Sequence, residues 1–461
     1  MLLAAILAAA LSDPLVSSQR AAAALDKSLE AHGSADPKVT LTVRADLVNE
    51  GQSLESIGPF EGYPFRMDVV LDPPKRLRVA TTSAIAGDFT FSDVLVLQDG
   101  KGYSLTPEVR TWSEVTSEPP VLNRYLPHRV IRGLLRNRAA LRALDDHTIL
   151  AGSQTIHLDP KTGLLQRVEQ VFAGTYGDTL RENVYEDYQR KDGILLPSRL
   201  RVRTKNAVHG TLENVFRYEW SGGRSRPPEE WAAEAAPPQG YVKADYSYRA
   251  QFEAKPLAPG VWLLENVSKT TGQWSYNVLV VAFDDFVLLT EAPLGSEQSE
   301  RILEKVRELA PGKPVRYLVQ SHHHGDHLGG IRPYIADGVT ILTGASAKPL
   351  IEKLAAAPFL LEPDRLQRAP KAPKIEVVSE PRTIADATQR AVIYNIGPNP
   401  HAKDMLVVHL PERKILYQSD MINEGEYPEN DATRAFRQKM RELGLQYDTI
   451  AGLHGRIVRL P

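Results

Sequence analysis

The sequence predicts a protein of two domains, an antiparallel β-sheet domain with helices (α+β) followed by a layered α/β domain. Three observations predict this class. Apolar and polar residues alternate over much of the first 220 residues, residues 221–240 are rich in Gly, Pro, Glu and Ala, and strands alternate with helices after residue 260. We place the β-sheet domain at 13–220, a linker at 221–243 and the second domain at 244–461. A chain of 461 residues is long for one domain and comfortable for two.

Composition narrows the range of partners. The chain is 42% hydrophobic and 24% charged, which is ordinary for a globular protein, and its net charge is −2. A chain without excess positive charge is not expected to bind nucleic acid. No internal apolar run reaches the roughly 18–20 residues that a transmembrane span needs. We therefore expect a small-molecule substrate, while the oligomeric state stays open. The absence of cysteine excludes thiols as nucleophiles or ligands.

The first twelve residues resemble the apolar core of a signal peptide. Residues 1–12 read Met-Leu-Leu-Ala-Ala-Ile-Leu-Ala-Ala-Ala-Leu-Ser, with small residues where cleavage would occur but no positive charge before them. We favour an exported protein, periplasmic or secreted, with this segment as the remnant of a signal peptide. The alternative is an alanine-rich helix of a cytoplasmic protein.

The first domain is expected to begin with a helix over 13–33 and to continue as a sheet. Residues 39–47 and 65–71 alternate with period two, and Asp99-Gly100 is a hairpin signal between two apolar runs. A long helix is expected over 122–144. We interpret the arginines along it as a solvated face rather than an anion-binding surface.

Strands are expected to resume after this helix. The expected strands are 155–158, 164–172, 196–204 and 212–220. A turn is expected at 159–163 and a hairpin at Asp192-Gly193. This order of sheet and helix resembles the half-barrel of bacterial periplasmic lipoprotein-carrier proteins, which hold acyl chains; the resemblance rests on pattern alone. The scattered histidines of this domain are expected to be structural: His128, His147, His157 and His209.

The second domain is expected to alternate strands and helices. Its expected strands are 260–265, 276–282, 286–291, 315–320, 339–342, 392–396, 405–410 and 414–419. One helix is expected to begin at Ser296, which would be its N-cap. Two further helices are expected over 331–336 and 348–356. Such an order is typical of a layered α/β domain.

The most informative stretch is a histidine-rich loop at residues 321–330. It contains the pattern His322-x-His324-x-Asp326-His327, directly after an expected strand. Residues two apart on an extended segment point the same way, so His322 and His324 can share one metal ion. The glycine before Asp326 lets the chain turn, so Asp326 and His327 can face a second ion. Imidazole suits zinc, and an added carboxylate also admits manganese or iron.

This pattern resembles the HxHxDH signature of the metallo-β-lactamase superfamily, and the later family motifs follow in order. His401 lies in Gly-Pro-Asn-Pro-His, Asp420 ends the apolar run 415–420, and His454 lies in Gly-Leu-His-Gly. The resemblance covers 246–461. It implies a four-layer αββα sandwich with the metal ions at one edge of the sheets.

The resemblance also implies a dinuclear zinc site. One ion would be held by His322, His324 and His401. The second would be held by Asp326, His327 and His454, with Asp420 bridging the two. Asp326 would also act catalytically, by orienting the nucleophile and moving its proton. Zinc is the expected metal, with iron or manganese as alternatives.

The expected activity is hydrolysis by a metal-bound hydroxide of a small ester, thioester, lactone or amide. Some β-lactamase classes lack the bridging aspartate, and the presence of Asp420 makes this chain unlike them. An exported enzyme would rarely meet glutathione thioesters, which argues against them as substrates. Two alternatives remain, an iron-dependent oxidoreductase on the same fold and an envelope lipid-binding protein with a structural metal. Glu291 departs from the family pattern, which has aspartate at this strand end. His323 and His409 are expected to be bystanders.

Overall fold

The computed structural model describes the chain from residue 13 to residue 460, with gaps. The described ranges are 13–33, 37–48, 62–73, 75–85, 89–223, 226–244, 252–266, 275–422, 429–455 and 457–460. The segment interpreted as a signal peptide, 1–12, therefore lies outside the described residues. Within them, no helix has the length and apolar character required to span a bilayer.

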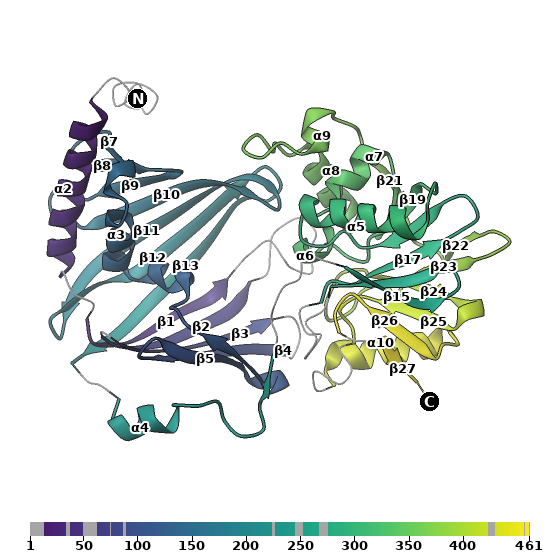
Figure 1. The fold of residues 1–461 in the computed structure, drawn as a ribbon, viewed down its shortest axis with the longest axis horizontal. Helices are drawn as coiled ribbons and strands as arrows, with labels where there is room; N and C mark the ends of the chain where they lie inside the picture. The colour runs from purple at the N-terminus through teal and green to yellow at the C-terminus, as the bar shows by residue number, and fades with distance from the viewer. Residues whose placement is uncertain are drawn as a thin grey trace.

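The first half of the chain forms one large, strongly bent sheet (Figure 1). In spatial order its strands run β14-β6-β5-β4-β3-β2-β1-β13-β12-β11-β10-β9-β8-β7, and neighbours are antiparallel except β14 and β6. The strands are β1 (Val39–Val48), β2 (Tyr63–Asp72), β3 (Arg76–Ile85), β4 (Phe89–Gln98), β5 (Lys101–Thr106), β6 (Thr111–Val115), β7 (Leu141–Ala143), β8 (Thr148–Ala151), β9 (Gln154–Leu158), β10 (Leu165–Gly174), β11 (Gly177–Lys191), β12 (Ile194–Asn206), β13 (Gly210–Gly222) and β14 (Val242–Lys243).

Period-two burial explains these strands. Along β1 the residues at 39, 41, 43 and 45 are buried while their neighbours face outward or are half-buried. The expected strands at 39–47, 65–71, 155–158, 196–204 and 212–220 are confirmed, as is the hairpin at Asp99-Gly100. The structure adds strands that the sequence interpretation did not list: β3, β6, β7, β8, β11 and β14.

Helices α2 and α3 contribute to the main buried core of this sheet. Helix α2 (Pro14–His32) confirms the first expected helix; its Asp13 cap accepts the N–H of Leu15. The expected helix over 122–144 is wrong for most of its length. Only α3 (Pro127–Leu135) is α-helical, after the 3₁₀ turn 120–125, and residues 141–143 form β7 and pair with β8.

The arginines of this stretch were interpreted as a solvated face, and the structure differs at one of them. Arg129 is buried and pairs with Glu118. Proline at 127 suits the first turn of α3, where its missing N–H costs nothing. The helix ends because the chain beyond it pairs with the sheet instead. This pairing is a tertiary contact, which local helix propensity does not predict.

The stretch interpreted as a linker contains secondary structure. Helix α4 (Pro228–Ala233) places Trp231 in a buried cluster with Val96, Tyr103 and Leu105. Strand β14 then pairs in parallel with β6. Part of 221–243 is therefore packed on the N-terminal sheet, and the proposed domain boundaries stay a prediction.

Two further sheets form the second half of the chain. The first C-terminal sheet has the order β15-β16-β17-β18-β19-β20-β21, and the second has the order β22-β23-β24-β25-β26-β27. Strands β18 to β21 are parallel, as are β25 and β26, and the other neighbours are antiparallel. The bounds are β15 (Glu253–Ala258), β16 (Val261–Glu265), β17 (Val278–Ala282), β18 (Val287–Thr290), β19 (Val315–Val319), β20 (Thr340–Thr343), β21 (Lys374–Val377), β22 (Arg382–Ala385), β23 (Arg390–Asn395), β24 (Leu406–Leu410), β25 (Ile415–Gln418), β26 (Thr449–Gly452) and β27 (Val458–Arg459).

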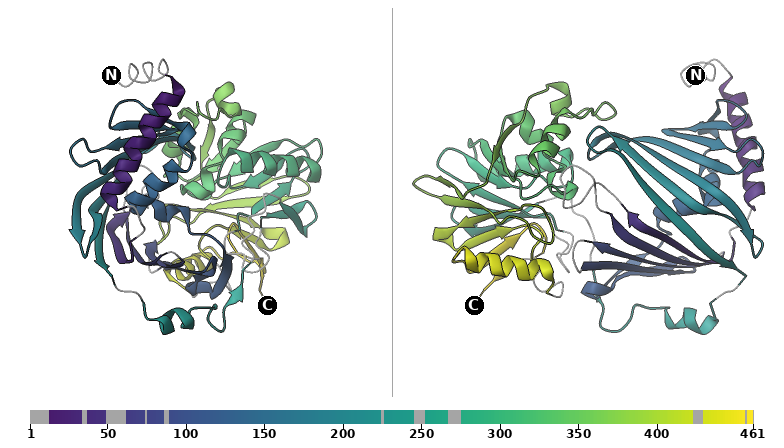
Figure 2. Two further views of the ribbon diagram at one scale, coloured as in Figure 1. Left: turned by 60° about the vertical axis from the view of Figure 1, so that its left-hand side comes forward. Right: turned by 180° about the vertical axis from the view of Figure 1, so that it is seen from behind.

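The buried clusters reveal four layers. One cluster lies between the two C-terminal sheets and includes Leu263, Leu288 and Val408. A second joins the first sheet to α5, α7 and α8, and a third joins the second sheet to α10. The helices are α5 (Ser296–Leu309), α6 (Gly325–Leu328), α7 (Arg332–Asp337), α8 (Lys348–Ala356), α9 (Arg365–Arg368) and α10 (Asp431–Glu442). The αββα sandwich expected from the resemblance is confirmed, and Figure 2 shows it beside the N-terminal sheet.

Two local details differ from expectation. Ser296 is the first residue of α5 rather than its cap, which is Gly295. Helix α10 was not expected, because few of its residues are apolar. Its buried contacts are Thr433, Phe436 and Met440.

Candidate metal centre

The seven predicted ligands come from loops at one edge of the sandwich. The histidine-rich loop follows β19, the His401 loop follows β23, Asp420 follows β25, and His454 follows β26. Ligand sites of α/β proteins commonly lie at the carboxyl ends of strands, where loops can present side chains on a rigid base. Residues separated by more than 130 positions in the sequence are brought together in this way.

The structure gathers all seven residues into two adjacent groups. One contains His322, His324, His401 and Asp420, and the other contains Asp326, His327 and His454. Within each group, ligand atoms lie within 4.8 Å of one another. Three or more side chains able to hold a metal come together only in these two places among the described residues. The grouping matches the ligand sets that the resemblance implies; the metal itself stays a prediction.

Asp420 faces both groups. Its Oδ2 lies 2.8 Å from Nε2 of His401 and 3.1 Å from Nε2 of His327. Its Oδ1 lies 3.4 Å from Nε2 of His454. One carboxylate thus contacts imidazoles from the two ligand sets, which is the geometry a bridging ligand requires.

The imidazoles are held so that Nε2 points inward. Nδ1 of His322 lies 2.9 Å from the hydroxyl of Ser321, and Nδ1 of His327 lies 3.0 Å from that of Ser419. Nδ1 of His454 donates to the carbonyl of Ser275 at 2.8 Å. Outer hydrogen bonds of this kind fix ring orientation and the ligating nitrogen in metal sites. The inward Nε2 atoms of His322 and His401 lie 3.2 Å apart, a convergence that fits a shared cation.

Burial and charge set the protonation of these groups. Burial, reinforced by neighbouring histidines, lowers the pKa of His322 and His324 well below the ordinary histidine value, so both are neutral ligands. Burial alone would raise the pKa of Asp420, but His327, His454 and His401 outweigh it and hold that pKa well below its usual range.

His327 behaves in the opposite way. Burial would lower its pKa, but the carboxylates of Asp420 and Asp326 outweigh burial and raise it well above the ordinary value. Without metal the centre therefore stores a proton on His327 beside ionised carboxylates. A divalent ion would replace that proton, because metal ligands must be deprotonated.

Glu291, which departs from the family pattern, lies beside the predicted ligand His327. It is fully buried, adopts a left-handed φ of 60°, and its Oε2 lies 3.7 Å from Nδ1 of His327. Gln320 donates to the same oxygen at 3.1 Å. A non-glycine residue in this conformation costs of order 1–3 kcal/mol and is typical of functional sites.

The His401 loop is shaped by an Asn side chain. Oδ1 of Asn399 accepts the backbone N–H groups of His401 and Ala402, each at 2.9 Å. This turn presents His401 without a regular element around it. Asp404 ties the same loop to β20 by accepting the N–H of Ser346 at 3.0 Å.

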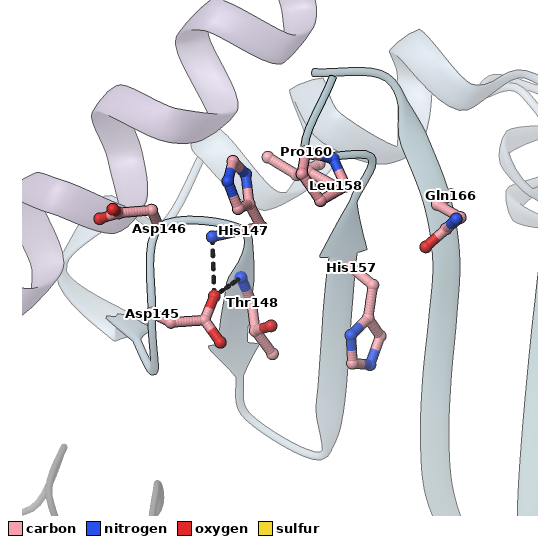
Figure 3. Close-up of a pocket in the computed structure, with 8 residues that line it drawn as sticks. All are labelled: Asp145, Asp146, His147, Thr148, His157, Leu158, Pro160 and Gln166. Carbon is pink, nitrogen blue, oxygen red and sulfur yellow. Dashed lines mark hydrogen bonds between the residues drawn. The ribbon is translucent and has the colours of Figure 1, made fainter. Parts of the chain in front are cut away.

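The other histidines lie outside the two groups. His409 contacts the carbonyl of Gln446 at 2.9 Å in β24, and His157 lies against Glu169. His147 lines a separate pocket of about 420 Å³ on the N-terminal sheet (Figure 3). There the Asp145 carboxylate accepts backbone N–H groups of His147 and Thr148, which explains the turn but assembles no ligand set.

Sequence reasoning missed the residues that support the ligands. Ser321 and Ser419 directly precede ligands, so their position in the sequence was a usable signal. Ser275 lies just before β17, far from the ligands in the sequence, and no local pattern marks it. Glu291, just after β18, was noted as a departure from the family pattern, but its contact with His327 was not predicted. Tyr176, in the turn after β10 of the N-terminal sheet, was also missed; its ring comes close to Gly325 of the histidine-rich loop.

Comparisons with known proteins found one family and several solved structures that resemble this chain. Residues 271–458 match the family model described as the metallo-beta-lactamase superfamily. A metallo-beta-lactamase from Pontibacter korlensis is 21% identical, covering 45% of this chain and 94% of that one, with a TM-score of 0.35. One from Hirschia baltica is 18% identical, covering 45% and 93%, with a TM-score of 0.33. A search of curated proteins found no match.

Proposed function

We propose that this protein is a metal-dependent hydrolase, because residues 271–458 match the family model of the metallo-beta-lactamase superfamily. We propose zinc as the metal, two ions per chain, and a small ester, thioester, lactone or amide as the substrate. The observation that supports this most directly is the position of Asp420, whose two carboxylate oxygens face imidazoles of both ligand groups.

The residues present fit two divalent ions. Five imidazoles and two carboxylates form the set, and within each group the possible ligand atoms lie within 4.8 Å of one another. His322, His324 and His401 would hold one ion, Asp326, His327 and His454 the other, and Asp420 would contact both. When bound, two such ions lower the pKa of water from 15.7 towards about 7 and polarise a substrate oxygen.

Asp326 is the side chain best placed to handle protons. Its side chain is 29% exposed, whereas that of His327 is 0% exposed. Burial would raise the pKa of Asp326, but His327 and His454 lower it below its usual range, so it is a carboxylate at neutral pH. It can therefore orient an attacking water, accept its proton and pass that proton to the leaving group.

The test is hydrolysis by protein that has been stripped of metal and reloaded with zinc. We expect activity on at least one of an ester, a thioester, a lactone and an amide, lost on chelation and restored by zinc. His324→Ala should lower kcat/KM by more than roughly 100-fold, since even outer partners of metal ligands are worth 10–100-fold. The matched control is His147→Ala, on an exposed turn of the N-terminal sheet, which should retain activity.

Two results would contradict the proposal. Hydrolysis that persists after chelation and in His324→Ala would place the activity elsewhere. Oxygen consumption by iron-loaded protein, without hydrolysis of any of the four substrates, would favour the iron-dependent oxidoreductase instead.

A further inference from the structure

Two turns of the N-terminal sheet reach the C-terminal domain beside the metal centre. The β10–β11 turn carries Tyr176, and the β12–β13 turn carries Val208 and His209. Val208 is 2% exposed and belongs to the buried cluster of the first C-terminal sheet and its helices; Tyr176 packs against the same cluster. Figure 1 shows the β10–β11 hairpin extending towards the side of the sandwich that carries α6.

The metal loop has a glycine where this hairpin touches it. A Cβ placed on Gly325, the first residue of α6, would lie 3.0 Å from Cζ of Tyr176 and closer still to its hydroxyl. The three nearest atoms all belong to Tyr176. Gly325 is not among the residues with positive φ, so its backbone would accept alanine. Glycine is required at 325 by the approach of Tyr176, not by the conformation of the loop.

Neighbouring contacts fix the hairpin in this position. A Cβ on Gly329, just after α6, would lie 2.5 Å from Cγ2 of Thr175. The backbone N–H of Asp178 donates to the carbonyl of Pro358 at 2.9 Å. Its carboxylate accepts the N–H of Leu360 at 2.8 Å. The turn is thus attached to the C-terminal domain on both sides of Tyr176.

Helix α6 depends on such support. It spans only Gly325–Leu328 yet carries Asp326 and His327, two ligands of the second group. A single helical turn is not stable on its own, because its nucleation is unfavourable, so packing must define its position.

We propose that Tyr176 is a positioning residue of the metal centre, supplied by the N-terminal domain. By packing on Gly325 it holds α6 so that Asp326 and His327 converge with His454. The inference rests on the proposed function in that these residues bind a metal. It assigns the N-terminal domain a part in the centre that the C-terminal ligand motifs alone do not contain.

The test uses the full chain, stripped of metal and titrated with Co²⁺. The visible absorption of Co²⁺ reports ligand geometry, and competition with a chelator reports affinity. Tyr176→Ala should change the spectrum and weaken the second binding step about tenfold, the lower end for outer partners of ligands. Tyr176→Phe keeps the ring and should behave like wild type.

A reciprocal substitution separates positioning from general damage. Gly325→Ala should weaken the second step, because its methyl group meets Tyr176, and Tyr176→Ala/Gly325→Ala should lose less than the sum of the single changes. The matched control is Gly133→Ala in α3, where a Cβ has open space and should leave binding unchanged. If Tyr176→Ala does not fold, Gly325→Ala alone decides, since it must still differ from wild type.

The outcomes distinguish the two proposals. A wild-type chain that binds no Co²⁺ would overturn the metal centre itself. A wild-type chain that binds Co²⁺, with Tyr176→Ala and Gly325→Ala indistinguishable from it in spectrum and affinity, would overturn the role of Tyr176 alone. A Gly325→Ala penalty of the same size with and without the Tyr176 ring would also overturn that role.

Discussion

Single residues show how the centre is prepared before any metal binds. His322, His327 and His454 each have Nδ1 engaged by a neighbouring oxygen, which leaves Nε2 for the interior. The centre therefore pays little rotational entropy when an ion enters.

A buried histidine far from the centre leads to a pH prediction. His32 ends α2, and its Nε2 accepts the backbone N–H of Leu165 at 3.0 Å. Burial, aided by His128, lowers its pKa from 6.5 to about 4. His32 therefore binds a proton more readily in the unfolded chain than in the folded one. Its contribution to the free energy of unfolding is fully present above about pH 6.5 and is lost as the pH falls towards 4. The loss can reach roughly 3 kcal/mol, and denaturant unfolding at several pH values measures it.

The variant His32→Gln isolates this effect. Glutamine does not titrate, so the variant should lack the His32 part of the decline between pH 6.5 and 4 while starting from a lower stability. Parallel loss of stability in wild type and variant over this range would show that His32 does not cause it.

At the scale of elements, buried ion pairs hold the helices that surround the centre. Arg332 of α7 is 1% exposed, and its Nε and Nη2 donate to the Asp364 carboxylate at 2.6 and 3.0 Å. Its Nη1 donates to the carbonyl of Leu354 at 2.8 Å. Asp364 in turn caps α9 through the N–H of Gln367. One guanidinium thus connects α7, α8 and α9.

Removing this guanidinium should be costly. Arg332→Met leaves Asp364 and a helix carbonyl without their charged partner, so we expect unfolding to become easier by about 3–5 kcal/mol in denaturant titrations. The matched control is Arg301→Met on α5, whose pairing with Glu297 is exposed and should be worth less than about 1 kcal/mol. Equal effects of the two substitutions would contradict this account.

Elements with a clear period were predictable from the sequence, and elements chosen by tertiary contacts were not. The strand over 39–47 alternates strictly and was found. The end of the expected helix at 122–144 was not, because residues 141–143 join a sheet edge whose partner β8 lies beyond a turn. Helix α10 was missed because it buries only three side chains. Local patterns do not record which partners a segment will meet.

For the whole molecule, the candidate site was more predictable than its surroundings. The seven candidate ligands were predicted because their spacing in the sequence resembles the motifs of a known family, and the fold brings them into two groups. Tyr176 was not identified as part of the site's surroundings, since it lies near no motif. Glu291 was noted only as a departure from the family pattern. His323, expected to be a bystander, is buried within the same loop.

Turns of the N-terminal sheet pack against the C-terminal sandwich near α6. The N-terminal sheet contributes Tyr176 and Val208 to the core of its neighbour, and Lys353 of α8 donates to the carbonyl of Val208 at 3.4 Å. Among the described residues, the N-terminal sheet has no group of possible metal ligands of its own. Under our proposal it acts on the metal centre through the position of Tyr176.

The most direct test of the central claim is the metal content of protein purified without added metal or an affinity tag. Elemental mass spectrometry should find about two zinc ions per chain in wild type and fewer in Asp420→Ala, because that carboxylate faces both ligand groups. Circular dichroism confirms that both proteins are folded. Folded wild-type protein that holds no transition metal, or an unchanged content in Asp420→Ala, would contradict the dinuclear centre.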